Sequence, residues 1–243
     1  MIGCMKLAVV IPAYNAGRHI DSVLERVGGL VRSGLSHVVV VDDGSRDDSA
    51  ERVLRHAPSG FRLELLRRGQ NGGYGAAMKD GLAAASSENP DVVACIHADG
   101  QYAPEALPGL LQQLSARGLD LLQGSRIASG TALQGGMPLY KYVGNALLNR
   151  LENRTLALEL TDYHSGYLLY GRRALELPFR ALSDSFDFDL EVIASARARG
   201  LAVGEAPVPT HYGDEVSHLN PLTYGLRVLR VMWNYRRGRY DAA

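Results

Sequence analysis

The sequence is poor in cysteine, has no long hydrophobic run and carries no excess of charge of either sign. Its 243 residues include two cysteines, Cys4 and Cys95. We therefore expect no disulfide framework and a reducing, cytoplasmic compartment. No apolar run approaches the roughly 20 residues that span a bilayer, and the first residues lack the pattern of a signal peptide. Any membrane contact is expected to be peripheral, at the inner face of a membrane.

The balance of charge disfavours one class of partner. Lysine and arginine together number 26, and aspartate and glutamate also number 26. A chain without net charge has no global field that attracts nucleic acid, so we expect no nucleic-acid partner. Hydrophobic residues make up 46% of the chain, which is ordinary for a globular protein of a size that buries a large core.

Short apolar runs alternate regularly with amphipathic segments in the first half of the chain. Strands are predicted at 6–12, 38–41, 61–66, 91–96 and 120–123, with helices between them. Ser45-Arg46-Asp47-Asp48 has the form of a capping box, which predicts that the second helix begins there. The alternation predicts an α/β fold with a mostly parallel sheet covered by helices on both faces.

Polar or glycine-rich clusters lie at the predicted strand ends or in the turn that follows. They are Pro12–Asn15, Asp42–Ser45, Asn71–Gly75 and His97–Gln101. Because ligands of such sheets bind beyond the carboxyl ends of the strands, the four clusters predict one shared site. The third cluster lacks the Gly-Lys-Ser/Thr of a P-loop and does not follow the first strand, which disfavours ATP hydrolysis and NAD chemistry.

Three of these clusters suggest particular contacts. His97, Asp99 and Gln101 are alternate residues after a buried apolar run, so an extended chain would point all three to one side. Together they could hold a divalent cation, and the cation a diphosphate, although a polar strand end capped at Gly100 is the alternative. Of Asp42 and Asp43, we expect one to be structural and Asp43 to bind ligand. Glycines in the third cluster permit close backbone approach to a nucleoside or phosphate.

The second half of the chain follows a different pattern. Residues 127–138 are glycine-rich and predict a mobile loop; helices are expected at 140–158, 188–198 and 222–237, and strands at 163–170 and 202–208. Residues 211–218 contain many groups that bind phosphate or metal, which suits either a lid over a ligand or a solvated loop. The last helix has a broad apolar side and an arginine-rich stripe, which suits a membrane interface or packing on the domain or a partner.

The motifs resemble, in their order and spacing, those of family 2 glycosyltransferases of GT-A fold. They are V-V-I-P-A-Y-N at 9–15, V-V-V-V-D-D-G-S at 38–45, N-G-G-Y-G-A-A at 71–77 and H-A-D-G-Q at 97–101. Within the family, the chain looks most similar to the dolichyl- or polyprenyl-phosphate sugar synthase-like branch. The resemblance implies a Rossmann-like GT-A domain at 1–219, followed by an amphipathic helix and tail at 220–243.

The resemblance also implies a set of site residues. Donor-binding residues would be Pro12, Tyr14, Asn15, Asp43, Gly72, Gly73, Asp99 and Gln101. Asp99 and Gln101 would hold Mg²⁺ or Mn²⁺ on the diphosphate of a UDP- or GDP-linked sugar. The chain departs from the family pattern at Tyr74, where a lysine is common, and at His97, where an aspartate is usual. His97 is either a third metal ligand, better suited to Mn²⁺, or a residue behind the other two.

Three functions remain open from the sequence. The first is inverting transfer of a sugar to a lipid phosphate, with Arg126 positioning the acceptor. The second is transfer to a soluble or glycan hydroxyl, which requires a carboxylate base. Asp187, Asp189 and Glu191 are the candidates, Asp189 foremost, although three acids at a helix start also suit the helix dipole. The third is a nucleotide-sugar-binding module without catalysis, suggested by His97. The oligomeric state stays open.

Overall fold

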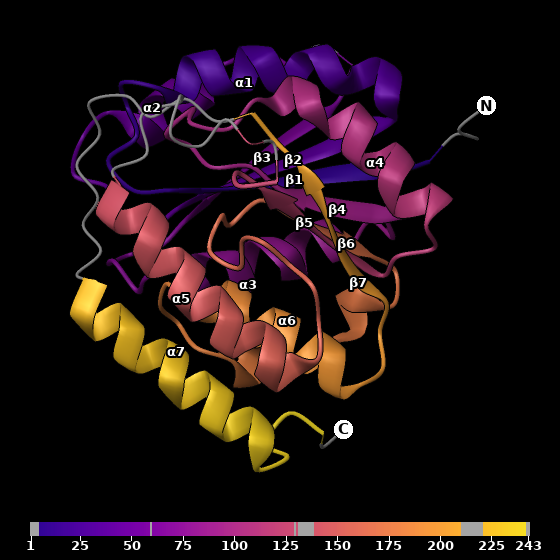
Figure 1. Ribbon diagram of the computed structural model, residues 1–243. Coiled ribbons are helices and arrows are strands. Elements are labelled where there is room, and N and C mark those ends of the chain that lie inside the picture. Colours follow the sequence, from indigo (N-terminus) through magenta and orange to yellow (C-terminus); the bar gives the residue numbers. More distant parts are fainter. Residues whose placement is uncertain (1–4, 59, 129, 131–138, 210–220, 242–243) are drawn as a thin grey trace.

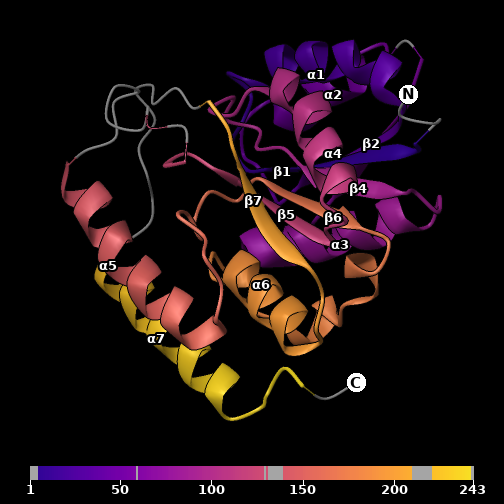
Figure 2. The same cartoon turned by 45° about the vertical axis from the view of Figure 1, so that its right-hand side comes forward.

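A seven-stranded mixed sheet with strand order β3-β2-β1-β4-β6-β5-β7 forms the centre of the molecule (Figures 1 and 2). The computed structural model describes residues 5–58, 60–128, 130, 139–209 and 221–241. The strands are β1 Leu7–Ala13, β2 Leu35–Asp42, β3 Arg62–Arg67, β4 Val92–Cys95, β5 Leu121–Ser125, β6 Leu168–Gly171 and β7 Val203–Pro207. Only β6 among them runs antiparallel to its neighbours, β4 and β5. The predicted mostly parallel sheet is confirmed.

Helices cover both faces of this sheet. They are α1 Ile20–Gly28, α2 Ser49–Arg55, α3 Tyr74–Ser86, α4 Leu107–Ala116, α5 Leu139–Leu156, α6 Phe188–Ala198 and α7 Pro221–Arg236. Alternate residues of β1 enter two different cores: Ala8 packs with residues of α3 and α6, and Val9 with residues of α1 and α4. This explains why β1 is apolar without interruption, because a parallel strand is buried on both faces.

Helices α5 and α7 lie side by side and form an outer layer beyond α6 (Figures 1 and 2). Val228, Val231 and Met232 of α7 join the core cluster that contains α6. None of the helices in the described residues is long and apolar enough to cross a membrane. The predicted loop at 127–138 and the segment 211–218 lie largely or wholly outside the described residues.

The predicted capping box at Ser45 is wrong. Helix α2 begins at Ser49, and its N-cap residue Asp48 makes no side-chain capping bond. The Ser45 hydroxyl instead accepts a hydrogen bond from the backbone N–H of Asn15, at 2.9 Å. The polar side chains of this segment fasten the loop after β2 to the loop after β1, a use that a local sequence pattern does not distinguish from a cap.

Candidate active site

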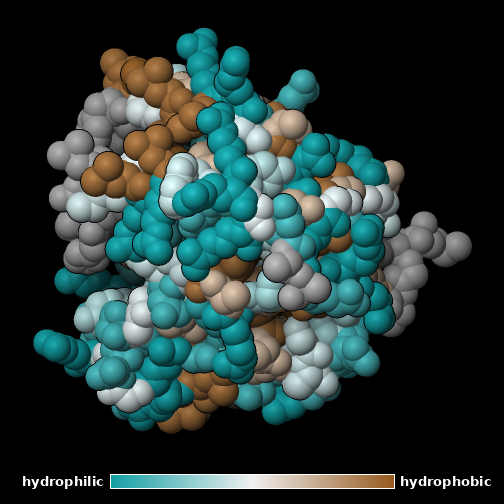
Figure 3. All heavy atoms as spheres, turned by 90° about the horizontal axis from the view of Figure 1, so that it is seen from below, coloured by the Kyte–Doolittle hydropathy of each residue, from teal (hydrophilic) through white to brown (hydrophobic). Residues whose placement is uncertain are grey.

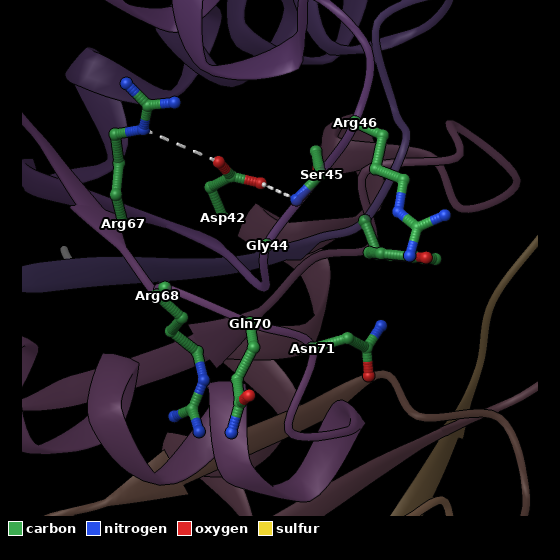
Figure 4. Close-up of a pocket in the computed structure, with 10 residues that line it drawn as sticks. Asp42, Gly44, Ser45, Arg46, Arg67, Arg68, Gln70 and Asn71 are labelled. Atoms are coloured by element: carbon green, nitrogen blue, oxygen red, sulfur yellow. Dashed lines mark hydrogen bonds and ion pairs between the residues drawn. The ribbon is translucent and has the colours of Figure 1, made fainter.

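The loops that follow β1, β2 and β3 enclose a pocket of about 550 Å³ at the carboxyl edge of the sheet (Figure 4). Its lining residues are Tyr14, Asp42, Gly44, Ser45, Arg46, Arg67, Arg68, Gly69, Gln70 and Asn71. Asp42 accepts a hydrogen bond from the backbone N–H of Ser45 at 2.9 Å, and Arg67 Nε lies 3.8 Å from its other oxygen. A tyrosine, a carboxylate and three arginines in one pocket suit an aromatic ligand that also carries negative charge.

Asp43, next to this pocket, holds the glycine-rich turn. Its two carboxylate oxygens accept hydrogen bonds from the N–H groups of Gly72 and Gly73, both at 2.9 Å, and Arg68 Nε lies 2.9 Å away. Gly73 has φ +98°, and a Cβ there would lie 2.5 Å from the carbonyl oxygen of Asp184, so only glycine fits. Of the two neighbouring aspartates, Asp42 lines the pocket and Asp43 shapes the turn.

The residues predicted at the end of β1 take different places. Tyr14 lines the pocket and is 45% exposed. Asn15 has φ +51° and accepts a hydrogen bond from the backbone N–H of Arg46 at 2.9 Å, so it joins the loops after β1 and β2. Pro12 lies within β1 itself and is half-buried.

The cluster after β4 separates into a turn and a buried ring. Asp99 accepts a hydrogen bond from the backbone N–H of Gln101 at 3.0 Å across Gly100, which has φ +74°. The His97 ring lies 5.6 Å from the ring of Tyr74 and 5.4 Å from that of Tyr102. Burial lowers the pKa of His97, and the nearby Asp99 only partly offsets this. His97 is thus an uncharged side chain packed among aromatic rings.

The residues after β4 offer few ligands for a divalent cation. Within the described ranges, no three His, Cys, Asp or Glu side chains gather as a metal site. Asp99 and Gln101 supply one carboxylate and one amide. Mg²⁺ is usually held by one or two carboxylates together with substrate phosphates, so these two residues fit a cation that is bound together with a diphosphate.

Arg126, at the end of β5, is fixed by a buried partner. Its Nε and Nη2 donate to the two oxygens of Asp162 at 2.6 and 2.9 Å. Burial raises the pKa of Asp162, but the guanidinium outweighs this effect and holds the pKa below its usual value. The positive charge of Arg126 also contributes to lowering the pKa of His97, so it acts electrostatically on the residues that follow β4.

The three acids at the start of α6 have separate roles. Asp187 accepts hydrogen bonds from the Ser183 hydroxyl and from Arg227 of α7, both at 2.9 Å. Glu191 accepts one from the Tyr240 hydroxyl at 2.7 Å. These two acids fasten neighbouring segments to α6.

Asp189 is the member of this group with an unused oxygen. Its Oδ2 accepts a hydrogen bond from the Tyr74 hydroxyl at 2.8 Å, whereas its buried Oδ1 has no hydrogen-bond partner in the described part of the chain. Burial raises the pKa of Asp189 to about 7, and the bond from Tyr74 opposes the rise. A carboxyl group that titrates near neutral pH is able to exchange a proton with a bound molecule.

Two features of this site are not evident from the sequence patterns. Tyr74 stands where a lysine is common, but its hydroxyl contacts Asp189 across 115 sequence positions. The pocket arginines Arg67 and Arg68 were not singled out. The sequence does contain a pattern that would have predicted them, because two adjacent arginines directly follow the strand predicted at 61–66, just before a glycine-rich turn.

Comparison with known proteins agrees with this architecture. The model of the family described as glycosyl transferase family 2 matches residues 8–177. Polyprenol monophosphomannose synthase of Mycolicibacterium smegmatis is 30% identical over 205 residues, which cover 82% of this chain and 75% of that protein. UDP-N-acetylglucosamine–dolichyl-phosphate N-acetylglucosaminyltransferase of Methanococcus voltae is 27% identical over 218 residues, with 84% and 85% covered.

A solved structure supports the fold. Glucosyl-3-phosphoglycerate synthase from Mycobacterium tuberculosis, in complex with Mn²⁺, UDP and phosphoglyceric acid, has a TM-score of 0.68 and 22% identity, covering 98% of this chain and 80% of that one. The GT-A type of α/β fold is therefore confirmed, as is the likeness to the dolichyl- or polyprenyl-phosphate sugar synthase branch. The chain belongs to glycosyl transferase family 2 and is an enzyme that transfers sugars.

Proposed function

We propose that the protein transfers a sugar, with inversion, from a UDP- or GDP-linked donor to a polyprenyl- or dolichyl-type lipid phosphate. The observation that carries this proposal is the pocket of about 550 Å³ formed by the loops after β1, β2 and β3, in a chain similar to enzymes that glycosylate lipid phosphates. The pocket offers Tyr14 and Asp42 to a nucleoside and arginines to its phosphates.

Donor binding is proposed to depend on both neighbouring aspartates and on the turn. Asp42 lines the pocket, while Asp43 acts through Gly72 and Gly73, whose backbone it holds in place. Asp99 and Gln101 would hold Mg²⁺ or Mn²⁺ on the diphosphate. When bound, such a cation neutralises the charge that develops on the leaving diphosphate. His97 is not among the ligands in this proposal, because its ring packs between those of Tyr74 and Tyr102.

The acceptor side offers two routes. A lipid phosphate is already anionic and needs a positioned cation rather than a base, and Arg126 is held for that role by Asp162. The second candidate, transfer to a hydroxyl acceptor, is favoured by Asp189, whose buried Oδ1 is unused and whose pKa is about 7. A group with this pKa suits the removal of a hydroxyl proton near neutral pH.

A lipid acceptor requires contact with a membrane surface, and α5 and α7 present a suitable face. Their outward side chains Leu139, Val143, Leu147, Leu226, Leu229 and Trp233 are 49–67% exposed. Figure 3 shows hydrophobic side chains gathered at the upper left, on the side that carries these two helices. Arg230 and Arg236 are exposed, Arg237 lies 4.3 Å over the ring of Trp233, and α7 contains no acidic residue. We propose that this face docks on the anionic inner surface of the cytoplasmic membrane.

Nucleotide titration tests the proposal at its first step. UDP or GDP should bind the parent protein by calorimetry in the presence of Mn²⁺ or Mg²⁺, and radiolabelled sugar should pass from the matching donor to a polyprenyl phosphate. Asp99→Asn should lose the metal-dependent part of nucleotide binding and slow transfer about a hundredfold. Asp91→Asn removes a carboxylate at the opposite end of β4 and should leave nucleotide binding unchanged. Equal transfer rates for Asp99→Asn and parent would refute the proposal.

A further inference from the structure

Asp189 lies near uncharged groups from four elements. Tyr74 at the start of α3 donates a hydrogen bond to it, and Cys95 on β4, Tyr170 on β6 and Tyr224 on α7 are near enough that its negative charge raises the pKa of each. Burial raises the pKa of each of these four groups above its usual value, so all four are uncharged at neutral pH. No described cation forms an ion pair with Asp189. The one group that stabilises its ionised form is therefore the Tyr74 hydroxyl, at 2.8 Å.

Gly166 shows what else borders this carboxyl group. A Cβ at Gly166 would lie 2.5 Å from His97 Nε2 and 3.4 Å from Asp189 Oδ2, so both atoms lie close to the same point. His97 is uncharged because burial lowers its pKa. The rings of Tyr74 and His97, the two positions at which the chain departs from the family pattern, are neighbours at 5.6 Å. Both departures thus lie beside one carboxyl group.

The Tyr74 ring is itself held firmly. It stacks on Phe186 with a centroid distance of 6.1 Å and an interplanar angle of 12°, and it meets Phe188 edge-on at 6.5 Å. A ring that packs against several aromatic neighbours, and whose hydroxyl contacts both Asp189 and Cys95 Sγ, has little rotational freedom. The direction of its O–H bond therefore determines which carboxylate oxygen is used and which stays open.

We propose that Tyr74 is a positioning residue that fixes Oδ2 of Asp189, leaving Oδ1 to take a proton from the oxygen that attacks the donor sugar. The inference rests on the proposed function in its hydroxyl-acceptor form, for which water is the simplest nucleophile. The nucleophile's O–H proton passes to Oδ1 as its oxygen forms a bond to the anomeric carbon. The bond from that carbon to the diphosphate breaks, and its electron pair leaves with the nucleoside diphosphate.

Tyr74→Phe removes the hydroxyl and keeps the ring. The ionised form of Asp189 then loses its one hydrogen bond, so the pKa of Asp189 should rise further. We expect an upward shift of about one pH unit, because a hydrogen bond to a charged group contributes on this scale. The acidic limb of donor hydrolysis, measured with the nucleotide sugar and Mn²⁺ but no acceptor, should move upward by the same amount, with kcat lowered and KM for the donor unchanged.

The matched control is Tyr163→Phe. Its hydroxyl also donates to a side-chain oxygen, that of Asn153 at 2.7 Å, and its ring is also buried, but it does not contact Asp189. This control should move neither the titration nor the hydrolysis profile. In an Asp189→Asn background, Tyr74→Phe should have no further effect on the pH profile, because the titrating group is gone.

A second measurement separates this inference from the proposed function. The carboxyl resonance of Asp189, in protein labelled with ¹³C at aspartate and assigned by its loss in Asp189→Asn, reports the titration without donor or turnover. If the parent binds no nucleotide but Tyr74→Phe shifts this resonance titration, the proposed function fails and the positioning by Tyr74 holds. If Tyr74→Phe leaves the titration in place, or lowers kcat without moving the acidic limb, the positioning role is overturned.

Discussion

Asp42 and Asp43 are adjacent and chemically identical, yet they serve different parts of the site. Asp43 accepts hydrogen bonds from two backbone N–H groups of the glycine-rich turn, whereas Asp42 accepts one from Ser45 and lines the pocket. The side chains of consecutive residues in a strand point in opposite directions, which is why the two aspartates contact different parts of the site. The sequence predicted that one of the two is structural but expected Asp43 to bind ligand, whereas Asp42 is the one that lines the pocket. The partners of Asp43 belong to a loop about 30 positions away, so no local pattern identifies them.

Asparagine substitutions at the two positions should therefore have different effects. Asp43→Asn keeps one acceptor oxygen for two donors and should lower the free energy of unfolding by about 1–3 kcal/mol in urea titrations. Asp42→Asn keeps an oxygen for Ser45 and should leave stability nearly unchanged. The same Asp42→Asn protein should bind the nucleotide about tenfold more weakly by calorimetry, since it loses a charge that faces the ligand. Equal stability losses at both positions would contradict this division.

At the scale of elements, α7 shows what a hydrophobic pattern leaves undecided. The sequence places Leu222, Leu226, Leu229, Met232 and Trp233 on one broad apolar side. In the structure, Met232 is buried with Val228, whereas Leu226, Leu229 and Trp233 are more than half exposed. Apolar residues occupy more than half of the helix circumference, so periodicity alone cannot identify the side that meets the core. The side of α7 that is buried is determined by its packing against α5 and α6.

The exposed face of α5 and α7 should bind vesicles. The parent protein should sediment with vesicles that contain anionic lipid, and less so with neutral ones, because arginines border the apolar side chains. The double variant Leu229→Ser/Trp233→Ser should remain largely in the supernatant. Leu54→Ser changes a leucine on α2, outside this face, that is 67% exposed and so even more accessible than Leu229 or Trp233, and this variant should sediment like the parent. A parent protein that stays in the supernatant with both lipid mixtures would exclude docking on a membrane.

At the scale of the whole molecule, sequence patterns predicted the sheet better than the site. The apolar runs predicted β1, β2 and β4, because a strand buried on both faces needs continuous apolar residues. The same requirement holds for β6, which runs antiparallel, so its direction left no local signal. The contact of Tyr74 with Asp189 likewise depends on how distant segments pack. Catalytic residue types are visible in a sequence, but their partners and burial are properties of the folded chain.

The fold buries the carboxyl group of Asp189 in an environment that disfavours its ionised form. The free energy of unfolding should therefore depend on pH. Asp189 has a pKa of about 7 in the folded protein against a usual value of 3.8. Its folded form binds the proton more tightly, so this residue's contribution to stability is present at low pH and is lost as pH rises through 7. Asp162 shifts in the opposite direction, and its contribution is lost only as pH falls below the usual range of aspartate. Of these two carboxyl groups, Asp189 is therefore the one whose contribution to the free energy of unfolding changes between pH 5 and pH 8.

Asp189→Asn removes the titrating group while keeping an oxygen that can accept from Tyr74. Its free energy of unfolding, relative to that of the parent, should increase by about 2–3 kcal/mol between pH 5 and pH 8 in urea titrations. Asp21→Asn, which changes an exposed acid paired with Arg52, should show no such trend. A variant that gains stability as pH rises while losing transfer would mean that the carboxyl group is retained for function at the expense of stability. A constant difference across this range would instead mean that Asp189 is ionised throughout, and that it cannot be the group whose protonation sets an acidic limb near neutral pH.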